Sequence, residues 1–155
     1  MKIKMREILF RGKRIDNGEW VEGFYVCLFE KKDGFYQANH YIFDGNIRFG
    51  EETYTGHGNY YQEVIICKRK IDEKTLGQFT GMTDKNGKRI FEGDIAKVLQ
   101  GKDKDIAYVG FENGAFMLYP KTGNIYERTL WEYWYNDWDV EVIGNITDNP
   151  ELLEK

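Results

Sequence analysis

The residues that could carry catalysis are few in this chain of 155 amino acids. A covalent mechanism needs a nucleophile beside an oriented base, and the sequence has two cysteines and two histidines but no serine. Cys67 and His57 are the cysteine and histidine closest to each other in the sequence, so they are the first candidate pair. Cys67 ends the apolar run Val64–Cys67, which is typical of a strand that carries a structural thiol. We therefore expect no nucleophilic pair.

The same residue types could bind zinc, since Cys27, His40, His57 and Cys67 are suitable ligands. Structural zinc sites use closely spaced ligand pairs, and this set contains none. A disulfide between Cys27 and Cys67 is the alternative, and a reducing cytosol disfavours it. We expect no metal and no cofactor.

Paired carboxylates could do acid–base work. Glu92 with Asp94, and Asp137 with Asp139, would each share one face of a strand. Asp94 follows Gly93 at a bend, where bonds to nearby backbone N–H groups explain it. Asp137 and Asp139 lie among aromatics near an acidic end. We expect no enzymatic activity, with an unrecognised hydrolase as the alternative.

Asn-Gly and Asp-Gly pairs between apolar runs are the strongest short signals for β-hairpins. The sequence contains five: Asn17-Gly18, Asp33-Gly34, Asp44-Gly45, Asn86-Gly87 and Asn113-Gly114. With frequent Gly and many aromatic residues, they predict a mainly β chain of antiparallel hairpins.

The stretch from Thr80 to Ile95 contains most of the turn chemistry. Asn86 and Gly87 tolerate positive φ and predict a turn over Asp84–Lys88. Gly93 and Asp94 predict a second bend before the next strand. This pattern suits a small closed roll of about five strands.

Helical signals are short. Asp72–Gly77 predicts one turn, Asn149–Leu153 predicts a short C-terminal helix, and Ile125–Tyr135 fits either a strand or a helix. Gly56–Asn59 predicts a loop. The charged run Lys68–Lys74 suggests a boundary, which gives an N-terminal β-hairpin region at residues 1–72 and a C-terminal part at 73–155.

The formal charge of −4 argues against a dedicated duplex-DNA binder. A small barrel that binds single strands is the rival interpretation. Its phosphate contacts would come from two basic groups, Lys68, Arg69 and Lys70 with Lys85, Lys88 and Arg89. Stacking would come from Trp131, Trp134, Tyr135 and Trp138.

Acidic neighbours of these aromatics would repel a phosphate backbone, so we favour packing in a core or an interface. The partner would be a second copy of the chain, giving a homo-oligomer, or another protein. No apolar run reaches membrane-spanning length and no signal peptide is evident, so we expect no membrane contact and a cytoplasmic location.

Three ordered motifs resemble those of the YopX-like family of bacteriophage and prophage proteins. They are the central Leu76–Met82, Asp84–Lys88 and Glu92–Ile95, the opening Phe10–Arg14 with Asn17–Val21, and the closing Glu141–Ile146 with Asn149–Leu152.

The resemblance implies a mostly β fold with an SH3-like barrel in the C-terminal half. It also implies an uncharacterised phage accessory protein in the cytoplasm of a bacterial host. It brings no reaction, cofactor or catalytic residue.

Overall fold

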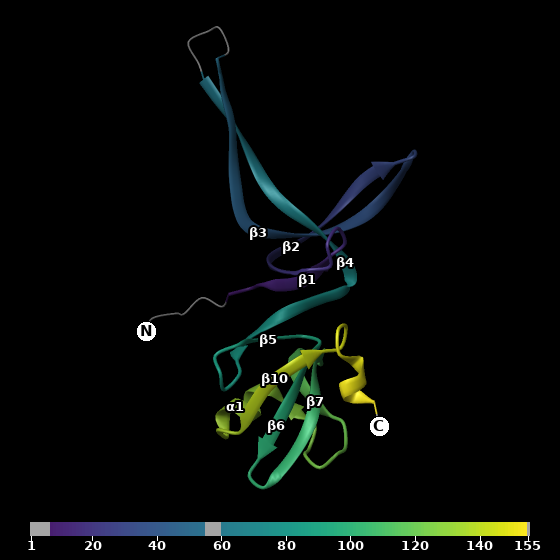
Figure 1. The fold of residues 1–155 in the computed structure, drawn as a ribbon, viewed down its shortest axis with the longest axis vertical. Helices are drawn as coiled ribbons and strands as arrows, with labels where there is room; N and C mark the ends of the chain where they lie inside the picture. The colour runs from purple at the N-terminus through teal and green to yellow at the C-terminus, as the bar shows by residue number, and fades with distance from the viewer. Residues whose placement is uncertain (1–6, 55–59, 155) are drawn as a thin grey trace. The chain divides into compact units, whose positions relative to one another are not determined.

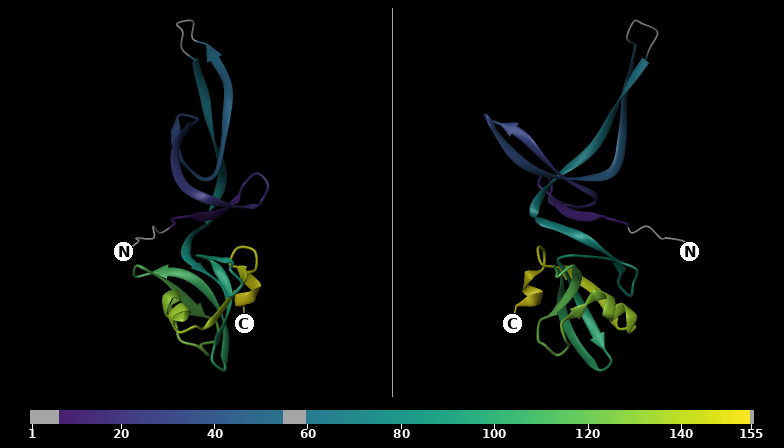
Figure 2. Two further views of the ribbon diagram at one scale, coloured as in Figure 1. Left: turned by 90° about the vertical axis from the view of Figure 1, so that its left-hand side faces the viewer. Right: turned by 180° about the vertical axis from the view of Figure 1, so that it is seen from behind.

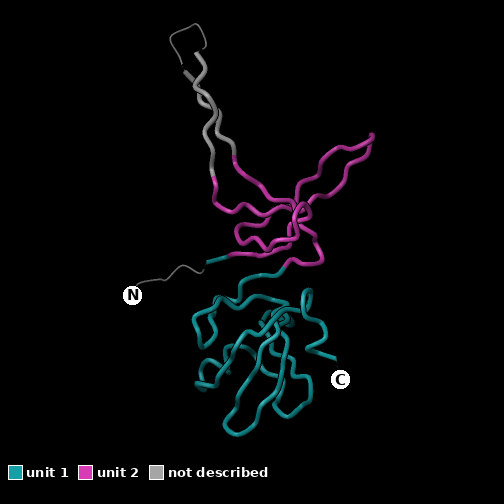
Figure 3. Tube along the Cα trace, viewed as in Figure 1, with its two compact units in different colours: residues 1–8, 77–155 teal, residues 9–76 magenta. Residues whose placement is uncertain are grey.

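The computed structural model describes the backbone of residues 7–54 and 60–154 and the side chains of residues 7–46 and 66–154. It is mainly β and antiparallel, which confirms the expected fold class. The chain forms two compact units, unit 2 at Leu9–Leu76 and unit 1 at Met1–Ile8 with Gly77–Lys155 (Figure 3). The boundary between the two units falls within strand β4 (Tyr60–Thr83). The boundary predicted from the sequence, between residues 72 and 73, lies in the same strand.

Unit 2 is built from β1 (Phe10–Arg14), β2 (Trp20–Lys32), β3 (Phe35–Tyr54) and the first part of β4. The strands pair in chain order, and an additional pairing of β1 with β4 partly closes the sheet (Figure 1). The turn at Asp33 and Gly34 has φ of 50° and 87° and joins Lys32 to its partner Phe35. Two positive φ values in a two-residue loop match the twist of the flanking strands, as the hairpin signal predicts.

The hairpin predicted at Asp44-Gly45 is wrong. Strand β3 continues through it, and the register with β4 shifts between Phe43 and Ile47. The Asp44 carboxylate accepts a hydrogen bond from the backbone N–H of Asn46 at 3.0 Å, and Gly45 has a φ of 81°. Positive φ at glycine serves a β-bulge as well as a turn, and local sequence does not distinguish the two.

The helical turn predicted at Asp72–Gly77 is also wrong, because β4 continues across it. The Asp72 carboxylate accepts from the backbone N–H of Lys74 at 3.1 Å, and the Thr75 hydroxyl donates to the Asp72 carbonyl at 2.7 Å. The capping chemistry is present, but it serves a local turn within the strand. The loop predicted at residues 56–59 lies outside the described residues.

Unit 1 contains a five-stranded antiparallel sheet in the order β10-β6-β7-β8-β9. Its strands are β6 (Asp94–Gln100), β7 (Asp103–Glu112), β8 (Ala115–Pro120), β9 (Arg128–Thr129) and β10 (Asp139–Asn145). The green strands lie side by side as one curved sheet in both views of Figure 2. Asn113 and Gly114, with φ of 51° and 82°, form the predicted turn between β7 and β8.

A second hairpin joins the last part of β4 to β5 (Arg89–Phe91) through the turn at Asn86-Gly87. Phe79 pairs with Phe91 across this hairpin. The segment Ile125–Tyr135, whose sequence fits either a strand or a helix, contains both, since β9 leads directly into α1 (Leu130–Tyr135). The predicted C-terminal helix is the 3-10 helix η1 (Pro150–Leu153), although the Asn149 side chain does not cap it.

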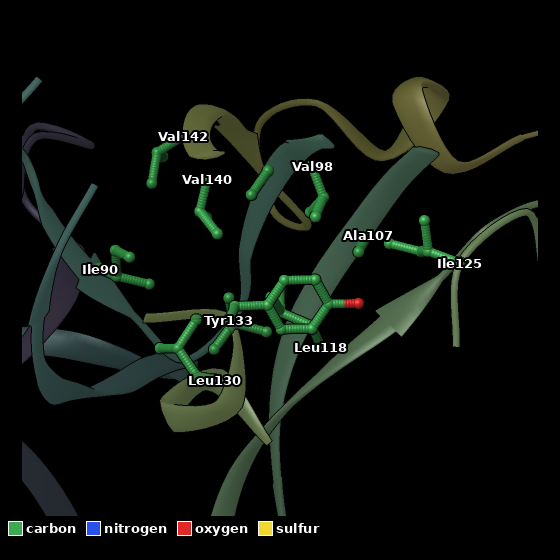
Figure 4. Packing of buried hydrophobic residues seen from close by; sticks show 11 residues of the cluster. Ile90, Val98, Ala107, Leu118, Ile125, Leu130, Tyr133, Val140 and Val142 are labelled. Atoms are coloured by element: carbon green, nitrogen blue, oxygen red, sulfur yellow. The ribbon is translucent and has the colours of Figure 1, made fainter. Parts of the chain in front are cut away.

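The core of unit 1 lies on one face of this sheet (Figure 4). Alternate residues of the strands point into it, and Ile90 of β5 with Leu130 and Tyr133 of α1 complete it. Tyr133 is fully buried, and its hydroxyl donates to the Tyr126 carbonyl at 2.9 Å. A fully buried phenol needs such a partner. The SH3-like form of this unit stays a prediction.

Candidate interaction surface around helix α1

Helix α1 is short, and its first turn is fixed by a capping box. The Thr129 hydroxyl accepts from the backbone N–H of Glu132 at 3.3 Å, and the Glu132 carboxylate accepts from the backbone N–H of Thr129 at 3.0 Å. The Thr129 hydroxyl and N–H, with Arg128 at 3.1 Å, hold the pKa of Glu132 below its ordinary value. Leu130 and Tyr133, three residues apart, anchor one side of the helix in the core.

The opposite side of α1 exposes three large aromatic side chains. Trp131, Trp134 and Tyr135 are 54%, 68% and 69% exposed. The rings of Trp131 and Tyr135 stack with centroids 5.0 Å apart, since residues four apart are neighbours on a helix. Trp138, predicted to belong to the same surface, is half-buried and packs edge-on against Tyr133 at 5.1 Å. Three of the four aromatics therefore form a surface, and the fourth borders the core.

Two hollows flank this aromatic surface. One, of about 350 Å³, is lined by Met82, Phe116, Leu130 and Trp131 among others. The other, of about 360 Å³, shares Met82 and Leu130 and adds Trp134 and Trp138. Its charged lining is Asp84, Asp137, Asp139 and Lys85, the last paired with Glu141 at 2.7 Å. We call the second one the acidic hollow. An aromatic ridge with a hollow on each side can receive side chains from another surface.

The predicted turn motif helps to hold the walls of the acidic hollow in place. Asn86 and Gly87 lie in the β4–β5 turn, which Asp84 closes by accepting from the backbone N–H groups of Asn86 and Lys88 at 2.8 and 2.9 Å. Burial would raise the pKa of Asp84, but the N–H groups of Val142, Lys88 and Asn86 hold it below the ordinary value. The turn is thus fastened to β10, which forms another wall of the hollow.

Gly93 and Asp94 form the second predicted bend. Gly93 has a φ of 81°, and its N–H donates to the Val109 carbonyl at 2.8 Å. The buried Asp94 carboxylate accepts from the backbone N–H of Phe91 at 2.7 Å. These bonds fix the passage from β5 into β6, so the Asp94 carboxylate serves backbone geometry.

The basic residues proposed as phosphate contacts are divided between the units. Lys68, Arg69 and Lys70 lie in unit 2, whereas Lys85, Lys88 and Arg89 lie in unit 1. Four of the six are in ion pairs: Lys68 with Glu30 at 2.8 Å, Arg69 with Asp44 at 3.0 Å, Lys85 with Glu141 at 2.7 Å and Arg89 with Glu7 at 3.5 Å. Neighbouring carboxylates thus already offset most of the charge that a phosphate backbone would require.

Unit 2 contains a hydrogen-bonded chain of titratable groups that the sequence does not reveal. Cys27 lies opposite His40 in the β2–β3 register. His40 Nδ1 lies 2.6 Å from the Tyr25 hydroxyl, and its Nε2 lies 2.8 Å from a Glu73 carboxylate oxygen. A tautomer with the proton on Nε2 satisfies both contacts. Burial raises the pKa of Tyr25, so this chain favours a neutral phenol.

Among the described residues, no group of three or more His, Cys, Asp or Glu side chains is arranged to hold a metal ion. His57, one of the four ligands considered, lies outside those residues. Asp137 and Asp139 both line the acidic hollow, where they give the aromatic walls a negative rim.

The family model described as YopX protein matches residues 9–154, nearly the whole chain. The chain belongs to the YopX family. Among solved structures, this YopX chain is similar to "protein EF1440 from Enterococcus faecalis", with 26% identity and a TM-score of 0.58. The alignment covers 97% of this chain and 100% of that one. No curated protein matches the YopX chain.

Several residues of the surface escape prediction. Thr129 and Glu132 could have been found, because Thr-x-x-Glu before apolar residues is a capping-box signal. Met82 and Phe116 carry no such signal, since their packing against the core of unit 1 brings them to the hollow. In the part of the YopX chain that the structure describes, no helix has the length and apolar character needed to cross a membrane.

Proposed function

We propose that this YopX family protein is a phage or prophage accessory protein that acts by binding other proteins, first of all a second copy of itself, and catalyses no reaction. The phage setting is what the resemblance of its ordered motifs to the YopX-like family of phage and prophage proteins implies. The observation that carries the proposal is the group of exposed aromatic rings on α1 between two hollows.

Exposed aromatic rings of this size are costly to leave in water. Burying one large apolar side chain contributes about 1.5–3 kcal/mol, and Trp and Tyr are the residues that most often dominate interfaces. Trp131, Trp134 and Tyr135 are adjacent, and the core side of α1 fixes their backbone. A partner would therefore meet a rigid surface, which lowers the entropic cost of binding.

A second copy fits because unit 2 carries a complementary element. At the end of the β2–β3 hairpin, Phe29, Phe35 and Tyr36 are 73%, 77% and 72% exposed. Lys31 and Lys32 lie beside them at the same end. Asp33 in the turn is the one described acid that faces these lysines, since Glu30 is paired with Lys68 at 2.8 Å. We call this end the basic arm. Apolar rings with positive charge match the acidic hollow, whose aromatic walls carry Asp137 and Asp139.

The proposed contact joins the basic arm of one copy to the acidic hollow of another. Two such contacts related by a twofold axis would close a dimer, the commonest arrangement of soluble oligomers. The ion pairs on four of the six candidate basic residues disfavour the nucleic-acid alternative. Loss of bound nucleic acid on adding salt would mark that alternative.

Sedimentation equilibrium tests the proposal. We expect the wild-type protein to be a dimer and the Trp131→Ala/Trp134→Ala variant to be a monomer over the same concentrations. Phe24→Ala is the matched control, because Phe24 is an aromatic residue of unit 2 that is equally exposed but lies outside the basic arm. A wild-type protein that remains monomeric, or an α1 variant that dimerises as the control does, would overturn the proposal.

A further inference from the structure

The outer face of the unit 1 sheet contains a cavity of about 330 Å³, lined by β6, β7, β10 and the segment after β8. Val98 and Ala107 point to the core, so their neighbours Lys97 and Ile106 point to the opposite face, where they are paired across the strands. Ile143 of β10 also lines the cavity. Ile106 and Ile143 give it apolar walls of a size that suits a small ligand.

The segment after β8 is held at this cavity by a buried carboxylate. Asp105 accepts hydrogen bonds from the Thr122 hydroxyl at 2.7 Å, the Asn124 N–H at 3.1 Å and the Ile106 N–H at 2.8 Å. Burial would raise the pKa of Asp105, but these bonds keep it below its ordinary value. The hydroxyl and backbone N–H donors that position the segment therefore stabilise the negative charge of Asp105.

The remaining charge at the cavity is positive. Lys97, Lys104 and Lys121 line it from three different segments. Lys121 donates from Nζ to the Leu152 carbonyl at 3.0 Å, which holds its ammonium group at the site. Among the side chains that the structure describes, no carboxylate forms an ion pair with Lys97 or Lys104. Glu141, which faces Lys97 across the strands, is paired with Lys85 at 2.7 Å, and Lys85 first and then the charge of Lys97 hold the pKa of Glu141 below its ordinary value.

We propose that this cavity binds a small organic anion, with its carboxylate or phosphate group between Lys97 and Lys104 and its aliphatic part against Ile106 and Ile143. Ammonium groups that form no ion pair with a described carboxylate, beside an apolar wall, attract both parts of such a molecule. None of the described residues that line the cavity is aromatic, so they offer no stacking platform for a nucleobase. This site is independent of helix α1 and of self-association.

Amide NMR on the full chain tests the site with four probes: hexanoate, hexyl phosphate, inorganic phosphate and neutral hexanol. We expect hexanoate or hexyl phosphate to shift the amides of residues 97, 104–106, 121–124 and 143 in a saturable way, with a Kd of about 1 mM or below. Hexanol and inorganic phosphate should each bind at least about tenfold more weakly, because each lacks one of the two interactions. The relative affinities of the two organic anions identify the head group.

The Lys97→Gln/Lys104→Gln variant should weaken binding by about tenfold or more, equivalent to about 1.4 kcal/mol. Lys88→Gln/Lys102→Gln removes the same charge from exposed lysines of unit 1 that do not line the cavity, and should change affinity less than about twofold. All four lysines are exposed, so these variants should fold. Equal binding of hexanol and hexanoate, an equal effect of both variants, or no saturable shift would overturn the proposal.

Discussion

The Asp84 carboxylate accepts a hydrogen bond from the backbone N–H of Val142 at 3.0 Å, although 58 residues separate them in the sequence. The same carboxylate closes the β4–β5 turn through Asn86 and Lys88. One buried side chain thus joins a local turn to strand β10. Because both segments line the acidic hollow, this bond helps to set the shape of the proposed binding surface.

Replacing Asp84 by Ala should lower the free energy of unfolding by about 3 kcal/mol or more, because the bonds to a charged acceptor are lost and the buried N–H of Val142 remains unsatisfied. Urea unfolding at pH 7 measures this. Asp103→Ala, which removes an exposed carboxylate in the same unit, should change stability by less than about 0.5 kcal/mol. Similar losses in both variants would contradict the structural role of Asp84.

The Asp105 carboxylate should make stability depend on pH in the acid range. Its pKa in the fold is below the ordinary value of 3.8. Its stabilisation is therefore fully present above pH 3.8 and is lost as the pH falls through the lower, folded-state pKa. The stability difference between wild type and Asp105→Asn should shrink as pH is lowered from 7 toward 2. A difference that stays constant would show that Asp105 does not titrate with folding.

Removing the capping hydroxyl of α1 should weaken both the helix and self-association. Thr129→Ala should cost about 1 kcal/mol of stability. It should also raise the dimer dissociation constant, because the stacked pair Trp131 and Tyr135 lies on this one short helix. Thr129→Ser keeps the hydroxyl and should restore both properties. Failure of Ser to restore them would assign the effect to packing of the Thr methyl group and not to the capping bond.

Charge exchange should distinguish the proposed contact from a purely apolar one. Lys31→Glu/Lys32→Glu on the basic arm should weaken dimerisation by placing acids against Asp137 and Asp139. Combining it with Asp137→Lys/Asp139→Lys should recover most of the loss. The dissociation constants of all forms, measured at low and high salt, test this. If the combined variant is weaker than either parent, the two surfaces do not meet.

The features that the sequence could predict are those fixed by the chemistry of neighbouring residues. The turns at Asp33-Gly34 and Asn113-Gly114 require positive φ at both positions, and the residue types supply it. Asp44-Gly45 carries the same signal but forms a bulge, since its outcome depends on the register of β3 with β4. Asp72 likewise makes its capping bond inside a strand whose length is set by pairing.

The surface itself was only partly predictable. Composition located the aromatic cluster but did not divide it between surface and core. Tyr133, which lies between the exposed rings in the sequence, enters the core, and Trp138 packs against it at the border of the core. The hollows depend on Met82 and Phe116, which lie far from α1 in the sequence. Likewise, the ion pair of Lys68 depends on the pairing of β2, β3 and β4, and that of Lys85 on the contact of the β4–β5 turn with β10, so a basic run alone could not reveal them.

A mixing experiment tests the central claim most directly. The Trp131→Ala/Trp134→Ala variant keeps an intact basic arm, and the Phe29→Ala/Phe35→Ala variant keeps an intact acidic hollow. Each should sediment alone as a monomer. Mixed in equal amounts, they should form a heterodimer weaker than the wild-type dimer, because one of its two contacts remains complete. If the mixture stays monomeric while the wild type dimerises, the basic arm does not bind the acidic hollow.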